Sequence, residues 1–429
     1  MTHRRKLLNL LLTSTLLAVM VAAAAMPASA NGEGGSHPGL GPNTRFYTPK
    51  PNPDAIRQIA RLLVHRQRAD AKLITQMIAT PQEVWVTGGT PQGVKQEVKK
   101  VVTLATVLHT VHILVAYNIP FRDCAQFSAG GATTMAEYNA WIDAFAAGIG
   151  NAKVVVILEP DGLGIIPWYK KFRGTAAEAG SYEWCQPAEA NEATAADERF
   201  AMLHYAVDAL KAKPNTIVYL DGTHSSWLGS GDAAHRLIQA GVELADGFFL
   251  NVSNYRFTEH LQKYGQWVSD CIYLSQHSGW PVQWCASQYF PANPNDFSTW
   301  GLSDAAYDQA FADTGLTRDP SVQAHFVIDT SRNGQGPWTP TTSYPDAQDW
   351  CNPPGRGLGL QPTANTGNDL LDAYLWVKIP GESDGACTRG LGPSGTTVDP
   401  EWGLVDPGAG DWFDEMTLQL VHTANPPLP

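Results

Sequence analysis

The sequence is poor in charged residues and has no excess of positive charge. Only 16% of its 429 residues are charged, and 29 Lys and Arg stand against 41 Asp and Glu, a formal net charge of -12. Binding to a nucleic-acid backbone depends on basic patches, so this composition argues against a nucleic-acid partner. The chain has 14 Trp, and many aromatic side chains with few charges favour a neutral, polyhydroxylated ligand over an ionic one.

Zinc-like spacings are missing as well, since the chain has neither a CxxC pair nor a His/Cys cluster of that kind. We therefore expect no metal and no cofactor. If the protein is exported, its six cysteines are instead candidates for disulfide bonds. They allow fifteen pairings, and their positions alone do not select one.

Only one apolar run approaches the length of a membrane span, and it lies at the N-terminus. A basic start at residues 4–6 precedes an apolar stretch at 7–25 and the small-residue site Ala28-Ser29-Ala30. This order predicts a secretory signal peptide at residues 1–30, with a retained membrane anchor as the alternative. We therefore expect a secreted, extracellular protein that does not associate with the membrane after cleavage.

The rest of the chain has no internal repeat, low-complexity tract or long linker. Residues 31–45 are rich in Gly and Pro, which predicts a flexible N-terminal lead. Residues 46–429 have the length of a single catalytic domain. Short apolar runs rich in β-branched residues alternate there with amphipathic stretches. The runs lie at residues 84–86, 112–118, 154–158, 216–220, 247–252, 324–329 and 374–378, and the amphipathic stretches include residues 54–79, 134–147 and 195–212.

Seven such strands alternating with helices predict an α/β fold with a parallel sheet buried on both faces. We expect the sheet to form a closed or nearly closed barrel, a distorted seven-stranded (β/α) barrel that is TIM-like. An open doubly wound sheet is the alternative, but the phosphate-binding GxGxxG pattern is absent after the first strand.

Polar side chains follow the C-terminal ends of these strands, where α/β barrels place active sites. Five of the six polar clusters carry an aspartate, namely Asp123, Asp161, Asp221, Asp329 and Asp384. Any one of them could cap a helix, but five at one edge predict a group of interacting carboxylates. In such a group the pKa of one member is raised, so it can act as an acid at neutral pH. Paired carboxylates beside aromatic side chains are what hydrolysis of a glycosidic bond requires.

Several motifs, in this order, resemble the glycoside hydrolase family 6 cellulases. They are YNIPFRDC, VVILEPDGLG, YLDGTHSSWLG, NVSNY, VIDTSRNGQGP, WCNPPGRGLG, TANTGNDLLDAYLWVKIPGESDG and the final ANPPL, and the similarity extends from about Trp85 to Leu428. The resemblance implies a β-1,4-glucanase that inverts the anomeric centre on a seven-stranded distorted α/β barrel. The expected partner is a β-1,4-glucan polysaccharide or oligosaccharide, bound by a monomer.

The resemblance also implies roles at the matching positions. Asp161 would be the general acid, and Asp123 would raise the pKa of Asp161 and help to organise the water. Asp384 would be the candidate base, directly or through a water relay, and Asp221 a supporting carboxylate. The implied substrate-binding residues are Trp85, Tyr117, His224, Trp227, Asn254, Trp350, Lys378 and Glu382. The implied disulfides are Cys124–Cys185 and Cys351–Cys387, which leaves Cys271 with Cys285.

Some positions depart from the family pattern. Gly162 stands where EPDSL is usual, Gly222-Thr223 where DAGH is usual, and Ser128 lies one place from a serine that helps to hold the water. Internal and chain-end cleavage both stay open, because the loop after Asp123 is short while residues 385–410 are long enough to form part of a roof. The alternatives are an enzyme of this fold acting on mixed-linkage β-glucan or another β-1,4-linked glycan, and a non-catalytic glycan-binding protein.

Overall fold

Parallel strands form a single sheet that follows the order of the chain. The computed structural model describes residues 39–172 and 180–429, so the predicted signal peptide and residues 31–38 of the predicted lead lie outside the described residues. Seven strands are described, and each pairs in parallel with the next one along the chain, from β1 to β7. They are β1 (Val84–Val86), β2 (His112–Ala116), β3 (Val154–Leu158), β4 (Thr216–Asp221), β5 (Gly247–Leu250), β6 (His325–Asp329) and β7 (Leu371–Leu375).

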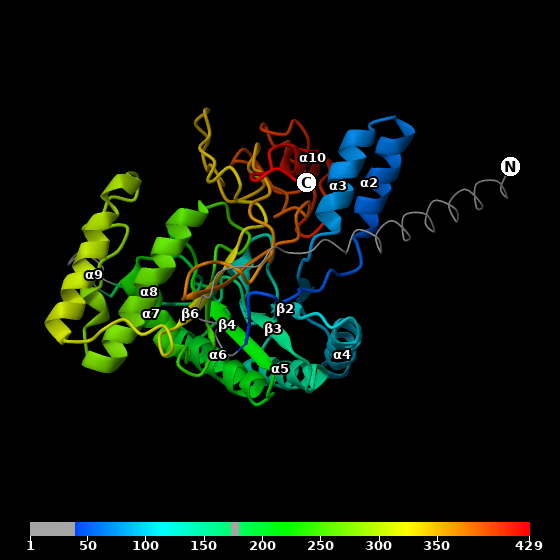
Figure 1. Ribbon diagram of the computed structural model, residues 1–429. Helices are drawn as coiled ribbons and strands as arrows, with labels where there is room; N and C mark the ends of the chain where they lie inside the picture. Colours follow the sequence, from blue (N-terminus) through cyan, green and yellow to red (C-terminus); the bar gives the residue numbers. More distant parts are fainter. Residues whose placement is uncertain (1–38, 173–179) are drawn as a thin grey trace.

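Helices connect most successive strands and cover the outer face of the sheet (Figure 1). The described helices are α2 (Pro53–Val64), α3 (Arg68–Ile78), α4 (Pro91–Val107), α5 (Met135–Ile149), α6 (Ala195–Lys211), α7 (Ser230–Gln239), α8 (Thr258–Ser278), α9 (Gly301–Thr314) and α10 (Asp414–His422), with the short 3-10 helices η1 (Asp123–Ala125), η2 (Val282–Trp284) and η3 (Phe297–Thr299). Strands alternating with helices around one parallel sheet confirm the predicted α/β barrel architecture. Residues 330–370, which link β6 to β7, consist of turns and irregular segments.

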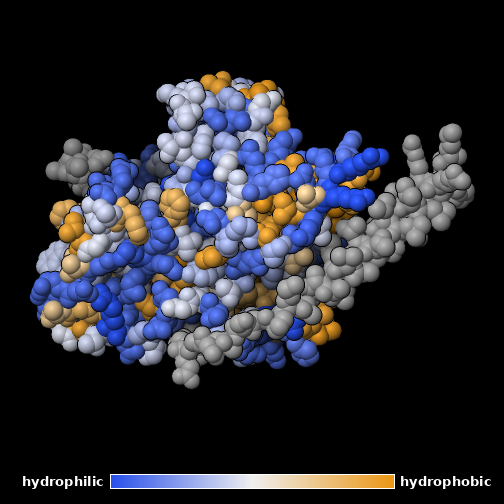
Figure 2. All heavy atoms as spheres, turned by 45° about the horizontal axis from the view of Figure 1, so that its top comes forward, coloured by the Kyte–Doolittle hydropathy of each residue, from blue (hydrophilic) through white to orange (hydrophobic). Residues whose placement is uncertain are grey.

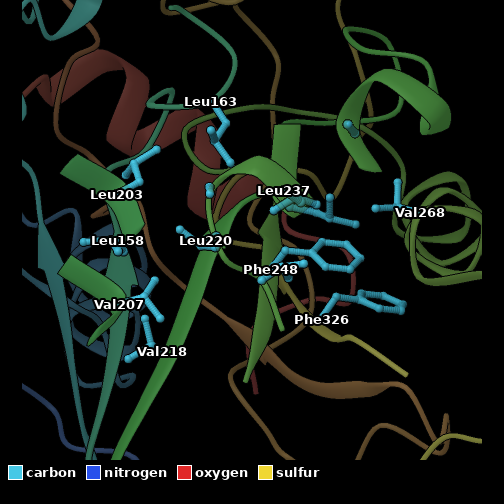
Figure 3. Packing of buried hydrophobic residues seen from close by; sticks show 14 of the residues in the cluster. Leu158, Leu163, Leu203, Val207, Val218, Leu220, Leu237, Phe248, Val268 and Phe326 are labelled. Atoms are coloured by element: carbon cyan, nitrogen blue, oxygen red, sulfur yellow. The ribbon is translucent and has the colours of Figure 1, made fainter. Parts of the chain in front are cut away.

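Side chains alternate between the two faces of the sheet. On β3, Val154, Val156 and Leu158 point outward to the helices, whereas Val155 and Ile157 belong to the cluster inside the barrel. Figure 3 shows the outer packing, in which strand residues meet residues of α6, α7 and α8. Because both faces are buried, each strand is apolar along most of its length, and this pattern made the strands recognisable in the sequence.

Several predicted elements differ in their bounds from the structure, and the strands predicted at residues 112–118 and 247–252 end at Ala116 and Leu250. The amphipathic stretch at residues 54–79 is divided into α2 and α3, and Arg66 at the break has a left-handed φ of 61°. The last strand was predicted at residues 374–378, but it begins at Leu371 and already ends at Leu375. The cause is Asp329, whose carboxylate accepts the backbone N–H groups of Val377 and Lys378 (3.2 and 3.0 Å), so these two groups leave the ladder. Asp329 therefore has a structural task in shaping the end of the sheet.

The two edge strands approach each other without pairing. Within the described residues the ladder runs from β1 to β7 and no pairing joins β7 back to β1. A side chain spans the opening instead, because the indole Nε1 of Trp85 donates to Val377 O at 2.8 Å. The barrel is thus nearly closed. Its open seam lies between β1, which carries the cleft residue Trp85, and the segment after β7, which carries the cleft residue Lys378.

The C-terminal end of the predicted flexible lead packs on the barrel. Leu40 is buried, and Val111 N–H donates to Arg45 O at 2.8 Å. Among residues 39–172 and 180–429, no helix has the length and apolar composition that crossing a bilayer requires. On the face shown in Figure 2, hydrophobic residues form small separate patches among hydrophilic ones.

Candidate active site

A cleft of about 630 Å³ lies at the C-terminal ends of the strands. It brings together residues from loops that follow nearly every strand. Asp123, Asp161 and Asp384 line it, together with all the residues expected to bind substrate: Trp85, Tyr117, His224, Trp227, Asn254, Trp350, Lys378 and Glu382. Asp221 is buried and does not line the cleft.

Asp161 is a carboxylic acid surrounded by negative charge. It follows β3 in a turn where Glu159 and Asp161 both have left-handed φ values, 52° and 63°. Among the described residues, no hydrogen-bond donor reaches its carboxyl group. Burial raises the pKa of Asp161 well above its ordinary value, and the negative charges of Asp221, Asp123 and Asp384 raise it further. The geometry therefore favours the protonated form of Asp161.

Asp221 anchors the turn that carries Asp161. Its carboxylate accepts the backbone N–H groups of Leu163 (3.2 Å), Gly164 (3.1 Å) and Thr223 (2.8 Å). Burial raises the pKa of Asp221 to about 6, against these donors. Asp221 thus acts on Asp161 through its charge and through the backbone from below the cleft surface.

Asp123 lies in a strained loop beside the same cleft. It has a left-handed φ of 58°, and its Oδ2 accepts the Ser128 N–H at 2.6 Å. Ser128 therefore contacts Asp123 through its backbone N–H. Burial raises the pKa of Asp123 to about 6. Arg122, which the sequence did not single out, braces the loop by donating to Ser128 O (2.8 Å) and Tyr117 O (2.6 Å).

Asp384 has the opposite environment. Arg332, fully buried, donates to both of its oxygens at 2.9 and 3.0 Å, and Tyr255 OH and Asn352 N–H each donate to Oδ2 at 3.0 Å. Lys378 Nζ lies 3.5 Å from Oδ1. Burial alone would raise the pKa of Asp384, but the charges of Arg332 and Lys378 and the donated hydrogen bonds lower it below its ordinary value. Asp384 is therefore held as a carboxylate.

Several residues that shape this site were missed in the sequence. Arg332, Tyr255 and Asn352 lie within the motifs that resemble the family, but nothing in their spacing connects them to Asp384. Glu159 was missed as well, although a charged residue directly after VVVIL is a signal of its own. Its buried carboxylate accepts N–H groups of Asn118 and Ile119 at 2.9 to 3.0 Å, and burial raises its pKa to about 7.

The three implied disulfides are confirmed. Cys124–Cys185, Cys271–Cys285 and Cys351–Cys387 are formed, with Cα–Cα distances of 5.8, 5.8 and 6.0 Å. The first bond directly follows Asp123 and ties its loop to residues 180–187. The third joins the residue after Trp350 to the loop that carries Asp384, so covalent bonds fix two walls of the cleft.

Aromatic and polar side chains complete the cleft. Trp85 and Tyr117 meet edge to face with ring centroids 5.4 Å apart. His224 accepts the Ser226 N–H on Nδ1 at 3.2 Å, and burial lowers its pKa well below the ordinary value. The ring is thus neutral, and the acceptor role of Nδ1 places the proton on Nε2, a donor suited to a hydroxyl group. The Trp227 ring centroid lies 5.7 Å from that of His224.

The loop after Asp123 crosses toward the opposite wall. The Phe127 and Trp350 ring centroids lie 5.8 Å apart, and a Cβ at Gly385 would come within 2.4 Å of the Phe127 ring. Gly385 thus permits the close approach of Phe127. On the far wall, Lys378 Nζ donates to Ser383 O at 2.9 Å. Cleft residues that the sequence did not predict include Arg122, Phe127, Trp184, Arg256 and Asp349.

One cluster outside the cleft contains residue types that can bind a metal ion, but two of these residues are engaged with other partners. Cys387, Asp399 and Asp406 place ligand atoms within 4.8 Å of one another. Cys387 is bound in a disulfide, and Asp399 forms an ion pair with the buried Arg389 at 2.7 Å. Burial raises the pKa of Asp406 to about 7, and the charge of Asp399 adds to this effect. The two carboxyl groups thus link residues 399–406 to Arg389 and to Asn352, whose Nδ2 donates to Asp406 at 2.9 Å.

Known proteins are similar to this chain in sequence and in fold. The chain is 31% identical over 384 residues to endoglucanase A of Cellulomonas fimi, covering 89% of this chain and 62% of that protein. It is 30% identical over 336 residues to a probable 1,4-beta-D-glucan cellobiohydrolase C of Neosartorya fischeri, covering 73% of this chain and 62% of that protein. The chain thus spans somewhat less than two thirds of the length of these relatives.

A solved structure gives the same picture. The endoglucanase Cel6 from Mycobacterium tuberculosis, in complex with methyl-cellobiosyl-4-deoxy-4-thio-beta-D-cellobioside, superposes with a TM-score of 0.60 at 31% identity, covering 89% of this chain and 98% of that chain. The family model described as glycosyl hydrolases family 6 matches residues 42–424, nearly all of the described chain. From this match and the shared fold, the chain belongs to glycosyl hydrolase family 6.

Proposed function

We propose that this protein is a secreted glucanase that hydrolyses β-1,4-glucosidic bonds of cellulose or a related β-glucan with inversion. The observation that carries the proposal is the opposite state of two aspartates in one cleft. Burial and neighbouring charge raise the pKa of Asp161, whereas Arg332 and Lys378 lower that of Asp384. One protonated and one ionised carboxyl group are what the two halves of glycosidic hydrolysis need.

In the proposed reaction, Asp161 gives its proton to the glycosidic oxygen as the bond from that oxygen to the anomeric carbon breaks. A water molecule attacks the anomeric carbon from the opposite face and forms the new C–O bond, which inverts the configuration. The proton released by the water passes to Asp384, directly or through a relay. Asp161, left as a carboxylate, then regains a proton from solvent, and Asp384 releases its proton to solvent.

Asp123 and Asp221 support this chemistry by acting on Asp161. Both place negative charge near it, which disfavours its ionisation before the sugar is bound. Asp123 also lies in the cleft, where it can help to orient the water. Its N–H bond from Ser128 fixes the carboxylate without neutralising it.

The cleft offers several kinds of contact to a sugar chain. The Trp85, Trp227 and Trp350 indoles supply apolar faces on which the C–H face of a pyranose can pack. His224 can donate from Nε2 to a hydroxyl, and Lys378 and Glu382 are charged partners for other hydroxyls. Tyr117, beside Asp161, would crowd the sugar that is cleaved.

The mode of cleavage is linked to the contact across the cleft. The packing of Phe127 on Trp350 and Gly385 supports partial cover of the site. Cover of this kind favours threading of chain ends, and its opening would admit internal bonds. Relatives with either name, endoglucanase or cellobiohydrolase, resemble this chain at similar identity.

Export and a monomeric state belong to the same proposal. The pattern at residues 1–30 predicts a cleaved leader, and three disulfide bonds with no free cysteine among the described residues are typical of an oxidising compartment. In this proposal the protein acts outside the cell on a β-1,4-glucan, as a monomer and without a cofactor.

Replacing Asp161 with Asn tests the proposal. The variant should lose turnover of soluble substituted cellulose and of mixed-linkage β-glucan in a reducing-sugar assay, while binding to cello-oligosaccharides is retained. Asp143→Asn, on the outer helix α5, is the matched control and should keep full activity. NMR of the first product should show the α-anomer. Unchanged turnover by Asp161→Asn would refute the acid assignment, and a wild-type protein that binds glucan without turnover would be a binding protein.

A further inference from the structure

Two aromatic rings stand exposed on a turn next to the cleft. The chain reverses at Ser287–Phe290, where the Ser287 N–H donates to Phe290 O at 2.7 Å. Tyr289 and Phe290, at the end of this turn, keep 44% and 76% of their surface exposed. Isolated exposed apolar residues are common, but two adjacent rings form a surface that can bind a ligand.

The turn is held rigidly from below. Gln288, fully buried, donates from Nε2 to Leu228 O at 2.8 Å, and Ser303 Oγ donates to Ser287 O at 2.7 Å. The Cys271–Cys285 disulfide fixes the chain just before the turn. The polar Gln288 is thus buried while the neighbouring aromatic rings are exposed to solvent, the reverse of the usual distribution. A surface fixed in this way loses little conformational entropy when a ligand binds to it.

The turn is continuous with the cleft wall. Tyr289 OH donates to the backbone oxygen of Trp227 at 3.2 Å, and Trp227 lines the cleft. Gln288 bonds to the next residue, Leu228, so the turn lies along the segment that carries the Trp227 ring. A Cβ at Gly229 would lie 3.8 Å from the Tyr289 ring, an ordinary contact. Tyr289 therefore packs against the segment that carries Trp227, and the exposed Phe290 follows it directly in the chain.

We propose that Tyr289 and Phe290 form an outer binding subsite for a β-1,4-glucan chain that extends out of the cleft past Trp227. The flat rings would support the C–H faces of the outer sugar units, whose hydroxyl groups stay in water. The inference rests on the proposed function, since the chain reaches the turn only when its other units occupy the cleft. The subsite serves long chains and contributes nothing to the binding of short ones.

Chain-length dependence tests the subsite. In the Asp161→Asn protein, the dissociation constants of cello-oligosaccharides from cellotriose to cellohexaose and of a soluble β-glucan polymer are measured by calorimetry, with and without Tyr289→Ala and Phe290→Ala. We expect unchanged binding of the shortest ligands and about two- to tenfold weaker binding per ring for the longest. Tyr289→Phe keeps the ring and should bind nearly as the parent does. Tyr205→Ala, at a tyrosine of α6 with 36% of its surface exposed, is the matched control.

Three results would overturn the subsite. Binding that is unchanged at every length would show that the rings do not touch the chain. Equal weakening of short and long ligands would show that the substitutions act only by disturbing Trp227. If the Asp161→Asn parent bound no glucan, the proposed function would fall and the subsite with it. If the Asp161→Asn parent binds glucan and the loss of both rings does not weaken that binding, the subsite alone has failed and the proposed function still stands.

Discussion

Replacing Arg332 with Met should move the acidic limb of the activity profile toward neutral pH. Arg332 is fully buried and donates to both oxygens of Asp384 at 2.9 and 3.0 Å. Methionine removes the charge and keeps an unbranched, shorter side chain. Asp384 then retains the donors Tyr255 and Asn352 and the Lys378 charge at 3.5 Å.

The size of the effect follows from Coulomb's law. Unit charges about 4 Å apart attract by about 4 kcal/mol at an effective dielectric constant of 20. The remaining donors offset part of this loss, and a pKa unit corresponds to about 1.4 kcal/mol, so the limb should move up by about one to three pH units. The sign is fixed, because a carboxylate that loses a cationic partner binds its proton more readily. Below the new midpoint Asp384 is protonated and cannot accept a proton from water.

The assay is the pH profile of kcat/KM on a soluble glucan, measured well below the unfolding temperature. Breaking a buried ion pair also destabilises the fold, by about 3 to 5 kcal/mol. Arg318→Met is the control for this loss, since it removes the charged partner of the buried Asp270 far from the cleft. This control variant should have a lower free energy of unfolding and an unchanged pH profile of kcat/KM. An acidic limb that stays where it is in Arg332→Met would refute the idea that Arg332 sets the charge state of Asp384.

Three further predictions follow from groups around the cleft. In Asp123→Asn the loss of one negative charge should lower the pKa of Asp161 and move the alkaline limb of kcat/KM to lower pH; an unmoved limb would show that the two groups are not coupled. Burial raises the pKa of Glu159 to about 7, so between about pH 4.5 and 7 the folded state binds a proton that the unfolded chain has lost. The free energy of unfolding should therefore fall by up to about 3 kcal/mol as the pH rises through this window, with a lower Tm at pH 8 than at pH 5, and Glu159→Gln should flatten the slope. Replacing Cys124 and Cys185 by Ser opens a crosslink between residues 61 apart and should lower the free energy of unfolding in urea by about 4 kcal/mol, and an equal stability of the two proteins would contradict the assigned bond.

The strands were predictable because burial on both faces makes each one apolar along most of its length. The exception, β7, shows the limit of that pattern. The predicted run stays apolar to Val377, past the end of the strand, and only the fold reveals that the Asp329 carboxylate accepts the N–H groups of Val377 and Lys378. In the same way the amphipathic pattern at residues 54–79 continues across the break at Arg66, because both helices bury their apolar faces against one cluster.

The candidate site was predictable to the extent that its residues follow strands. The carboxyl ends of parallel strands share an edge, so a polar residue after each strand reaches the cleft. The partners of those residues were not predictable in this way. Arg332 lies 52 positions from Asp384 and Tyr255 lies 129 positions from it, and no local pattern links such distances. The position of a carboxyl group could thus be inferred from the sequence, whereas its charge state required the fold.

The charge state is the property on which the chemistry depends, and the two key groups are coupled. Asp384, held ionised by Arg332, is one of the negative charges that raise the pKa of Asp161. Arg332 therefore acts on both, since by keeping the base charged it helps to keep the acid protonated. Without Arg332, Asp384 becomes neutral at a higher pH, and wherever it is neutral it no longer raises the pKa of Asp161. The activity profile of Arg332→Met should then narrow from its acidic side, while its alkaline limb, measured where Asp384 is ionised in both proteins, stays in place.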